Sequence, residues 1–306
     1  MKESHMFKNF FEVEQYIQNQ ETKKRIALCG AQDDTALKAL VRAKRKGIAE
    51  GVLIGDENAI NELLESMGEP ASDYEIINET NESKSARTAY RYVHEKNADI
   101  PMKGLMQSSS FLSAAMNPSF DFLSDNDTLC AVTVFYYPPR DRLMFVADCA
   151  INISPTLDDK VNIIKNSVPL IRSFGIETVK VAVVSVIETI NPDIISSVDA
   201  DTLSNMEWDK GIVVEGPFAL DNALDVEAAK HKGINSEVAG QADFLLMPDL
   251  CAGNIFHKAM HFFGKAPNAG VMCGPKTPVV FNSRTDTPDT KYHSILTAVM
   301  QSCMRA

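Results

Sequence analysis

Residues 25–67 read RIALCGAQDDTALKALVRAKRKGIAEGVLIGDENAINELLESM, and this stretch decides the fold. Two short apolar runs, 25–29 and 51–54, have the length and composition of buried strands. Each run is followed by an amphipathic helical pattern, at 33–46 and 57–67. Because strands that alternate with helices in this way form parallel βαβ units, the stretch predicts an α/β fold.

The alternation continues along the rest of the chain. Two runs on either side of the turn formed by Pro138 and Pro139 predict a β-hairpin. The closing helical pattern, 291–304, is expected to pack back on the first part of the chain. The other expected strands and helices lie at 75–77, 82–96, 129–136, 143–147, 157–174, 179–186, 192–206, 212–214, 222–232, 244–247, 252–263 and 278–281.

A second alternating set begins near residue 148, so we predict two domains. The first consists of residues 1–147 plus 280–306, and the second of residues 148–279. Two such lobes are expected to share a cleft. Ligands of α/β proteins bind at the carboxyl ends of the strands, so the candidate site residues are sought in the turns that follow strands.

Composition restricts the class of protein. A chain of 306 residues with 45% hydrophobic content lies near the size at which one core divides into two. No apolar run approaches the roughly 20 residues of a membrane-spanning helix. The six cysteines are scattered without a Cys-x-x-Cys pair, as expected of reduced thiols in a cytoplasmic protein. A formal net charge of -11 disfavours nucleic acid and anionic membranes as partners.

The segment NSRTDTPD, residues 282–289, lies between a strand pattern and the closing helix. A helix N-terminus offers free backbone N–H groups, Arg284 adds a bidentate fork and Ser283 adds a hydroxyl, so this segment can bind phosphate. Asp289 can then accept a proton beside the bound anion. The alternative is a capping cluster, in which Asp286 or Asp289 caps the helix and Arg284 is a surface cation. Spacing alone leaves both interpretations open.

Three more turns carry polar groups. In the segment 102–112, Gly104 lets the backbone approach a ligand and Ser108 can donate a hydrogen bond to an anion, unless this is an ordinary loop that caps a helix. Asp221 either orients a ligand or is the N-cap of a helix. Asn254 follows Gly253 at another strand end and offers an amide.

Several familiar motifs are missing from the sequence. It contains no Gly-x-Ser-x-Gly elbow, no Gly-x-x-x-x-Gly-Lys-Ser/Thr loop and no Gly-x-Gly-x-x-Gly turn. His257 and His261 are four residues apart, but the Glu that a hydrolytic zinc helix places beside the first His is absent. Covalent serine catalysis, ATP hydrolysis and an ordinary dinucleotide site are therefore disfavoured, and no metal site is expected.

Together, these segments resemble the phosphate acetyl/butyryltransferase family, and most closely its phosphate butyryltransferase branch. The resemblance spans most of the chain and rests on several motifs in family-like order. These are AKRKGIAEGVLIGD (43–56), MKG (102–104), NISPTLDDK (152–160), GPFALDNA (216–223), KHKGI (230–234), VAGQAD (238–243), PDLCAGN (248–254) and the pair Ser283-Arg284.

The resemblance implies two αβα lobes with a central cleft, related to isocitrate and isopropylmalate dehydrogenases, and a homodimer. It places Ser283 and Arg284 at the acyl phosphate chemistry, with a nearby acid as the base. We assign that acid as Asp289, with Asp286 in reserve. Further substrate contacts are expected from Lys103, Ser108, Asn254 and Asp221.

The resemblance also implies the reaction, which is reversible transfer of a short acyl group, butyryl or similar, between coenzyme A and inorganic phosphate. Acyl-CoA and phosphate meet in a ternary complex without an acyl-enzyme, and no metal or tightly bound cofactor is expected. The sequence departs from the family at Cys251, where Glu is usual, at Cys130-Ala131, where Ser-His is common, and at Ser108, where Thr is usual. Two alternatives remain: a metal- and NAD-dependent decarboxylating dehydrogenase of the same fold, or a non-catalytic CoA-binding regulator.

Overall fold

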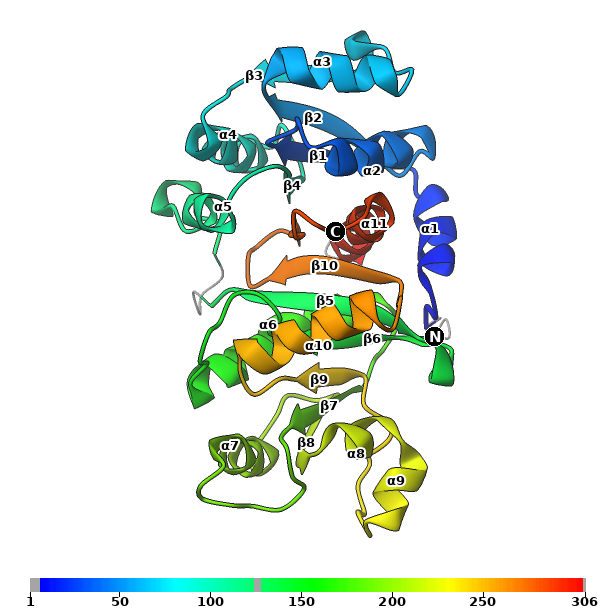
Figure 1. Ribbon diagram of the computed structural model, residues 1–306, viewed down its shortest axis with the longest axis vertical. Coiled ribbons are helices and arrows are strands. Elements are labelled where there is room, and N and C mark those ends of the chain that lie inside the picture. The colour runs from blue at the N-terminus through cyan, green and yellow to red at the C-terminus, as the bar shows by residue number, and fades with distance from the viewer. Residues whose placement is uncertain (1–5, 124–127, 305–306) are drawn as a thin grey trace. The chain divides into compact units, whose positions relative to one another are not determined.

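The computed structural model describes residues 6–123 and 128–304. The chain divides into two compact units. The N-terminal unit comprises Phe10–Asp127 and Asn268–Ala306, and the central unit comprises Met1–Asn9 and Thr128–Pro267. Each is a mixed α/β unit, which confirms the fold class predicted from the alternating pattern (Figure 1). The division predicted from the sequence, into residues 1–147 plus 280–306 and residues 148–279, stays a prediction.

The N-terminal unit is built on strands in the order β3-β2-β1-β4-β11-β10. The first five of these run parallel to one another, and β10 is antiparallel to β11. The parallel strands therefore end along one edge. The turns that follow them, where candidate site residues were sought, lie along this edge. The strands are β1 (Lys24–Cys29), β2 (Ala49–Gly55), β3 (Glu75–Asn78), β4 (Ile100–Lys103), β10 (Asn268–Cys273) and β11 (Val279–Val280).

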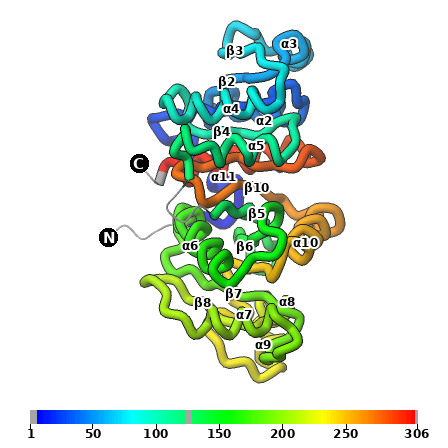
Figure 2. The backbone as a smooth tube through the Cα atoms, turned by 90° about the vertical axis from the view of Figure 1, so that its left-hand side faces the viewer, coloured from blue at the N-terminus to red at the C-terminus, as the bar shows by residue number. Residues whose placement is uncertain are grey.

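Helices cover both faces of these strands. Figure 1 shows α1, α2 and α11 on one side and α4 and α5 on the other, and α4 and α5 face the viewer in Figure 2. Asp33, Asp56 and Asn81 cap α2, α3 and α4 with their side chains. The helices are α1 (Phe10–Gln18), α2 (Asp34–Arg45), α3 (Glu57–Ser66), α4 (Glu82–His94), α5 (Ser108–Ala115) and α11 (Pro288–Met304).

The central unit has strands in the order β5-β6-β9-β7-β8. The predicted hairpin is present, because β5 pairs antiparallel with β6 around the short turn Pro138–Arg140. The remaining pairs are parallel. The strands are β5 (Cys130–Tyr137), β6 (Arg142–Ala147), β7 (Val179–Val184), β8 (Ile212–Phe218) and β9 (Phe244–Leu246).

The core of the central unit follows the alternation of side chains along β6. Met144 and Val146 belong to a cluster with Phe256 and other side chains of α8, α9 and α10. Phe145 points to the opposite face, where its ring packs edge-on against Phe174 at 5.3 Å between centroids. The helices are α6 (Leu157–Ser173), α7 (Ile195–Ser204), α8 (Leu220–Leu224), α9 (Val226–His231) and α10 (Leu250–Phe262).

One helix differs from its prediction. The pattern at 222–232 suggested a single helix, but the chain forms two short ones, α8 and α9, that meet at Asp225. The carboxylate of Asp225 accepts the backbone N–H of Ala228 at 2.7 Å, so this residue starts a new helix. The predicted N-cap role of Asp221 is wrong, because Ala219 stands at the N-cap of α8 and Asp221 lies in its first turn.

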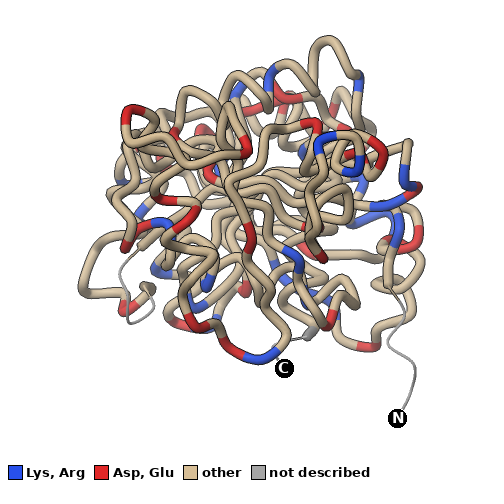
Figure 3. Tube along the Cα trace, turned by 90° about the horizontal axis from the view of Figure 1, so that it is seen from below, with Lys and Arg blue, Asp and Glu red and all other residues tan. Residues whose placement is uncertain are grey.

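Charged residues of both signs are interspersed along the trace, as Figure 3 shows. The acidic residues that give the net charge of -11 are therefore spread along the chain. None of the helices within 6–123 and 128–304 combines the length and the apolar run that a membrane crossing needs.

Candidate active site

The ends of three neighbouring parallel strands meet at one edge of the N-terminal unit. Cys29, at the end of β1, pairs with Lys103, at the end of β4, and Met102 pairs with Val280 of β11. A Cβ atom on Gly104 would lie 2.4 Å from the carbonyl oxygen of Gly30. The glycine that the sequence suggested for contact with a ligand therefore admits the backbone of β1, and it holds the ends of β1 and β4 together.

Lys103 is a buried cation at the centre of this edge. Only 2% of its surface is exposed, and its Nζ lies 3.3 Å from the carbonyl oxygen of Asn282. Within the described residues no carboxylate lies within ion-pair distance of this ammonium. Burial lowers the pKa of Lys103 below its ordinary value, and the positive charges of Lys291 and Arg284 lower it further. A buried cation surrounded by other cations favours an anionic ligand.

A second buried lysine, Lys291, comes from the first turn of α11. Its Nζ lies 2.8 Å from Oδ2 of Asp33 and 2.7 Å from Oγ1 of Thr35. Asp33 is also the N-cap of α2, where its Oδ1 accepts the backbone N–H groups of Thr35 and Ala36 at 3.0 Å. Burial alone would raise the pKa of Asp33, but the hydrogen bonds from Lys291 and Thr35 outweigh burial and hold the pKa below its ordinary value.

The turn after β11 is shaped by Asp286. This side chain is 4% exposed, and its Oδ2 accepts the backbone N–H of Ser283 at 2.9 Å and the amide of Asn282 at 3.3 Å. Its Oδ1 and the Oδ1 of Asn282 are buried without a hydrogen-bond partner in the described structure. Asp286 thus builds the turn, and the helix cap falls to Thr287, whose hydroxyl accepts the N–H of Thr290 at 3.2 Å.

The turn presents its other polar side chains outward. Arg284 is exposed, and its guanidinium makes no hydrogen bond or ion pair within the described part of the chain. The hydroxyl of Ser283 lies 3.1 Å from that of Thr285. Asp289 is also exposed, and its Oδ1 lies 2.6 Å from Nη1 of Arg42 on α2. The predicted base therefore forms an ion pair through one of its two carboxylate oxygens.

The remaining predicted contacts lie apart from this turn in the sequence and have other partners. Ser108 is the exposed first residue of α5. In the central unit, Asp221 pairs with Lys232 at 3.1 Å, and this partner lowers the pKa of Asp221. Asn254 donates its amide to the carbonyl of Cys149 at 3.1 Å. No group of three or more His, Cys, Asp or Glu side chains suited to a metal ion occurs in residues 6–123 and 128–304.

Comparison with known proteins relates this arrangement to a family. Residues 56–299 match the family described as "Phosphate acetyl/butaryl transferase". The chain belongs to this family. It is 40% identical over 298 residues to the phosphate butyryltransferase of Clostridium acetobutylicum, covering 96% of this chain and 98% of the relative. It is 39% identical over 275 residues to the phosphate acetyltransferase of Thermotoga maritima, covering 89% and 93%.

Solved structures agree with this assignment. A branched-chain phosphotransacylase from Enterococcus faecalis V583 has a TM-score of 0.82 with 26% identity, covering 91% of this chain and 98% of that one. A phosphotransacetylase from Streptococcus pyogenes has a TM-score of 0.78 with 21% identity, covering 96% and 98%, and this second likeness concerns the fold alone.

The departures from the phosphate acetyl/butyryltransferase pattern have different surroundings. Cys130 is buried, with its Sγ 3.8 Å from the hydroxyl of Ser167. The N–H of Ala131 donates to Oδ2 of the buried Asp148 at 3.3 Å. Cys251, by contrast, is exposed in the first turn of α10. The first two substitutions therefore change the interior of the central unit, and the third changes its surface.

Sequence reasoning about this family member missed Lys291 and Asp33. One signal was available, because a lysine in the first turn of a helix opposes the positive end of the helix dipole and so suggests a specific acidic partner. The partner itself is 258 residues away, and no local pattern points to it.

The Lys291–Asp33 pair gives a test of stability. Replacing Lys291 with Met leaves the carboxylate of Asp33 buried and unpaired, so we expect the free energy of unfolding to fall by about 3–5 kcal/mol. Urea unfolding followed by circular dichroism measures this change. As a control, Lys230→Met removes an exposed ion pair with Glu227 and is expected to cost about 0–1 kcal/mol. Equal effects of the two substitutions would contradict the structural role of the buried pair.

Proposed function

We propose that this phosphate acyltransferase moves a short acyl group, butyryl or similar, reversibly between coenzyme A and inorganic phosphate, and that the turn at 282–289 carries the chemistry. The observation that carries the proposal is the excess of cations at this edge of the N-terminal unit. Lys103, Lys291 and Arg284 face the two carboxylates of Asp33 and Asp286 there. One positive charge is left over in a chain whose net charge is -11.

Arg284 is the main anion contact in this mechanism. An exposed guanidinium without a partner can hold two phosphate oxygens at once, and it can offset the negative charge that develops on the thioester carbonyl. Ser283 beside it donates its hydroxyl to the phosphate or to the carbonyl. Lys103 adds a buried positive charge behind the turn, at 3.3 Å from the Asn282 carbonyl.

The reaction needs no covalent intermediate on the enzyme. A phosphate oxygen attacks the carbonyl carbon of the acyl-CoA, the carbon–sulfur bond breaks, and the proton of the phosphate passes by way of the Asp289 carboxylate to the departing thiolate. In the reverse direction Asp289 takes the proton of the CoA thiol. Positioning two reactants beside each other can supply about 7–11 kcal/mol of barrier reduction, so a site without a strong nucleophile is adequate.

Further parts of the proposal concern the wider molecule. Ser108, Asn254 and Asp221 are proposed as additional substrate contacts, and coenzyme A and phosphate are the only small molecules that the reaction requires. We also propose two αβα lobes of the isocitrate/isopropylmalate dehydrogenase type. A 4-hydroxythreonine-4-phosphate dehydrogenase from Salmonella typhimurium supports this at the level of the fold, with a TM-score of 0.53 and 13% identity.

A homodimer in the cytoplasm completes the proposal. Helix α10 and its last turn expose three large apolar side chains, Ile255, Phe262 and Phe263, and Phe263 is 90% exposed. Apolar side chains exposed so close together are typical of a protein interface, and a second copy of the chain is the partner that the family resemblance suggests. The six cysteines are all free thiols, which suits a reducing compartment.

The activity itself is tested with acetyl-, propionyl-, butyryl- and branched acyl-CoA plus phosphate, by measuring release of free thiol. Arg284→Ala is expected to lower kcat about 100- to 1000-fold, because it removes the donor fork at the developing charge. Arg284→Lys keeps the charge but not the fork and should recover part of this loss. Near-normal turnover by Arg284→Ala at saturating phosphate would show that the central cation lies elsewhere.

The role of Lys103 is tested through the KM for phosphate. Lys103→Met is expected to raise the KM for phosphate roughly ten- to a hundredfold, because one charge-assisted contact is lost, with a smaller change in the KM for acyl-CoA. Lys84→Met is the matched control, since Lys84 is exposed on α4. An unchanged KM for phosphate in Lys103→Met removes this lysine from the site.

The base is tested by comparing two carboxylates. Asp289→Asn is expected to slow acylation of CoA by acyl phosphate about 100-fold or more, because an amide cannot accept the thiol proton. Asp286→Asn keeps an oxygen that can accept the Ser283 N–H, so the turn should persist and the rate should change less. The reverse order of effects would transfer the role of base to Asp286.

A further inference from the structure

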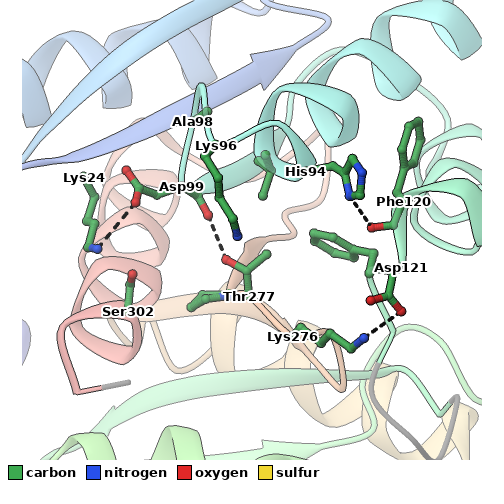
Figure 4. Close-up of a pocket in the computed structure, with 13 residues that line it drawn as sticks. Lys24, His94, Lys96, Ala98, Asp99, Phe120, Asp121, Lys276, Thr277 and Ser302 are labelled. Atoms are coloured by element: carbon green, nitrogen blue, oxygen red, sulfur yellow. Dashed lines mark hydrogen bonds and ion pairs between the residues drawn. The ribbon is translucent and has the colours of Figure 1, made fainter. Parts of the chain in front are cut away.

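A pocket of about 500 Å³ opens at the opposite edge of the same strands, within the N-terminal unit. Lys24 is the first residue of β1, Asp99 directly precedes β4, and Thr277 lies just before β11. Figure 4 shows these residues around the pocket together with the end of α4. Lys103 and the turn at 282–289 lie at the other ends of β4 and β11, so this pocket is distinct from the candidate active site.

The walls of the pocket are fixed by hydrogen bonds between distant segments. Thr277 donates its hydroxyl to the carbonyl of Asp99 at 2.7 Å, and the N–H of Lys276 donates to the carbonyl of Phe122 at 2.8 Å. The Nδ1 atom of His94 lies 2.9 Å from the carbonyl of Phe120. The pocket is therefore formed without a ligand, and binding would need little reorganisation of the chain.

The residues that line the pocket carry more positive than negative charge. Lys24 pairs with Asp99 at 3.4 Å, and Lys276 pairs with Asp121 at 2.7 Å. The ammonium of Lys96 has no hydrogen-bond or ion-pair partner among the residues that the structure describes, and Figure 4 shows this side chain extending among the residues that line the pocket. One positive charge in the pocket is thus left for a ligand.

Two of the lining residues have a backbone conformation that favours glycine. Lys96 has φ of 64° and Asp121 has φ of 46°. In the described residues only two other non-glycine residues have positive φ, Asp141 and Lys265. Lys96 lies just past the end of α4 and Asp121 ends the short helix Pro118–Phe120, and a left-handed residue is a common way for a helix to end. Glycine would fit position 96 better, but it would remove the ammonium.

The pocket also has an apolar wall. Val93, Ala98 and Phe122 line it and are each about 95% buried, with 6%, 5% and 5% of their surfaces exposed. Phe120 and Pro278 add further apolar surface. A bare inorganic ion would leave this wall in contact with water, whereas a ligand with a compact apolar body would cover it.

We propose that this pocket binds a small organic anion, with one phosphate or carboxylate group at Lys96 and a compact apolar body against Val93, Ala98 and Phe122. The inference does not depend on the acyl transfer proposed for the other edge of the strands. Phenyl phosphate is a suitable probe, because it combines a phosphate group with a flat apolar ring of the right size.

Isothermal titration with phenyl phosphate tests the proposal in four proteins: wild type, Lys96→Asn, Lys265→Asn and Arg284→Ala. Asparagine tolerates positive φ, so both lysine variants should keep the fold, and their thermal midpoints check this. Lys265 is the matched control, since it is an exposed lysine with φ of 49° in the central unit. Arg284→Ala reports any binding at the candidate active site.

We expect a saturable site that persists in Arg284→Ala and Lys265→Asn and that Lys96→Asn weakens about tenfold, because one charge-assisted hydrogen bond is lost. In Arg284→Ala, which lacks the main phosphate contact of the candidate active site, orthophosphate and phenol should each bind at least roughly ten times more weakly than phenyl phosphate. The proposal is overturned if no saturable binding occurs, if Lys96→Asn binds like wild type, if Arg284→Ala abolishes binding, or if orthophosphate binds to Arg284→Ala as tightly as phenyl phosphate does.

Discussion

The buried ion pair between Lys291 and Asp33 is the interaction on which the N-terminal unit depends. It joins two residues that are 258 positions apart, and both side chains are more than 90% buried. Separating these two buried charges would leave each without its partner, so the pair fixes the start of α11 against the start of α2. The turn at 282–287 leads directly into α11, and it is therefore held beside the ends of β1 and β4.

This pair also explains how an acidic protein prepares a place for an anion. Asp33 neutralises Lys291, and Asp286 is occupied by the N–H of Ser283. Lys103 and Arg284 are left without carboxylate partners, one buried behind the turn and the other exposed in front of it. Phosphate has the charge to satisfy both. The net charge of -11 then acts against larger polyanions, which would also meet the acidic remainder of the chain.

Features of the fold and of the candidate site were predictable from the sequence when the residues that determine them are close together in the chain. The alternation at 25–67 gave the α/β class and the helix starts, because strands, helices and caps are decided by near neighbours, as Asp33 and Asp56 show. The importance of Ser283 and Arg284 came from family resemblance, since spacing alone favoured a capping role for this segment. The partners of Lys291 and Asp289 were not predictable, because they lie 258 and 247 residues away. The close approach of Gly30 to Gly104 was not predictable for the same reason, since the atom that excludes a side chain at Gly104 lies 74 positions earlier in the chain.

The choice between the two acids of the turn can be argued from what protonation would cost each of them. Asp286 is buried and its carboxylate holds the N–H of Ser283, so adding a proton to it weakens the turn that presents Arg284. Asp289 is 76% exposed and gives up only an ion pair with Arg42, which at the surface is worth about 0–1 kcal/mol. A base must change its protonation state in every turnover. The carboxylate that can do so without disturbing the anion site is therefore Asp289.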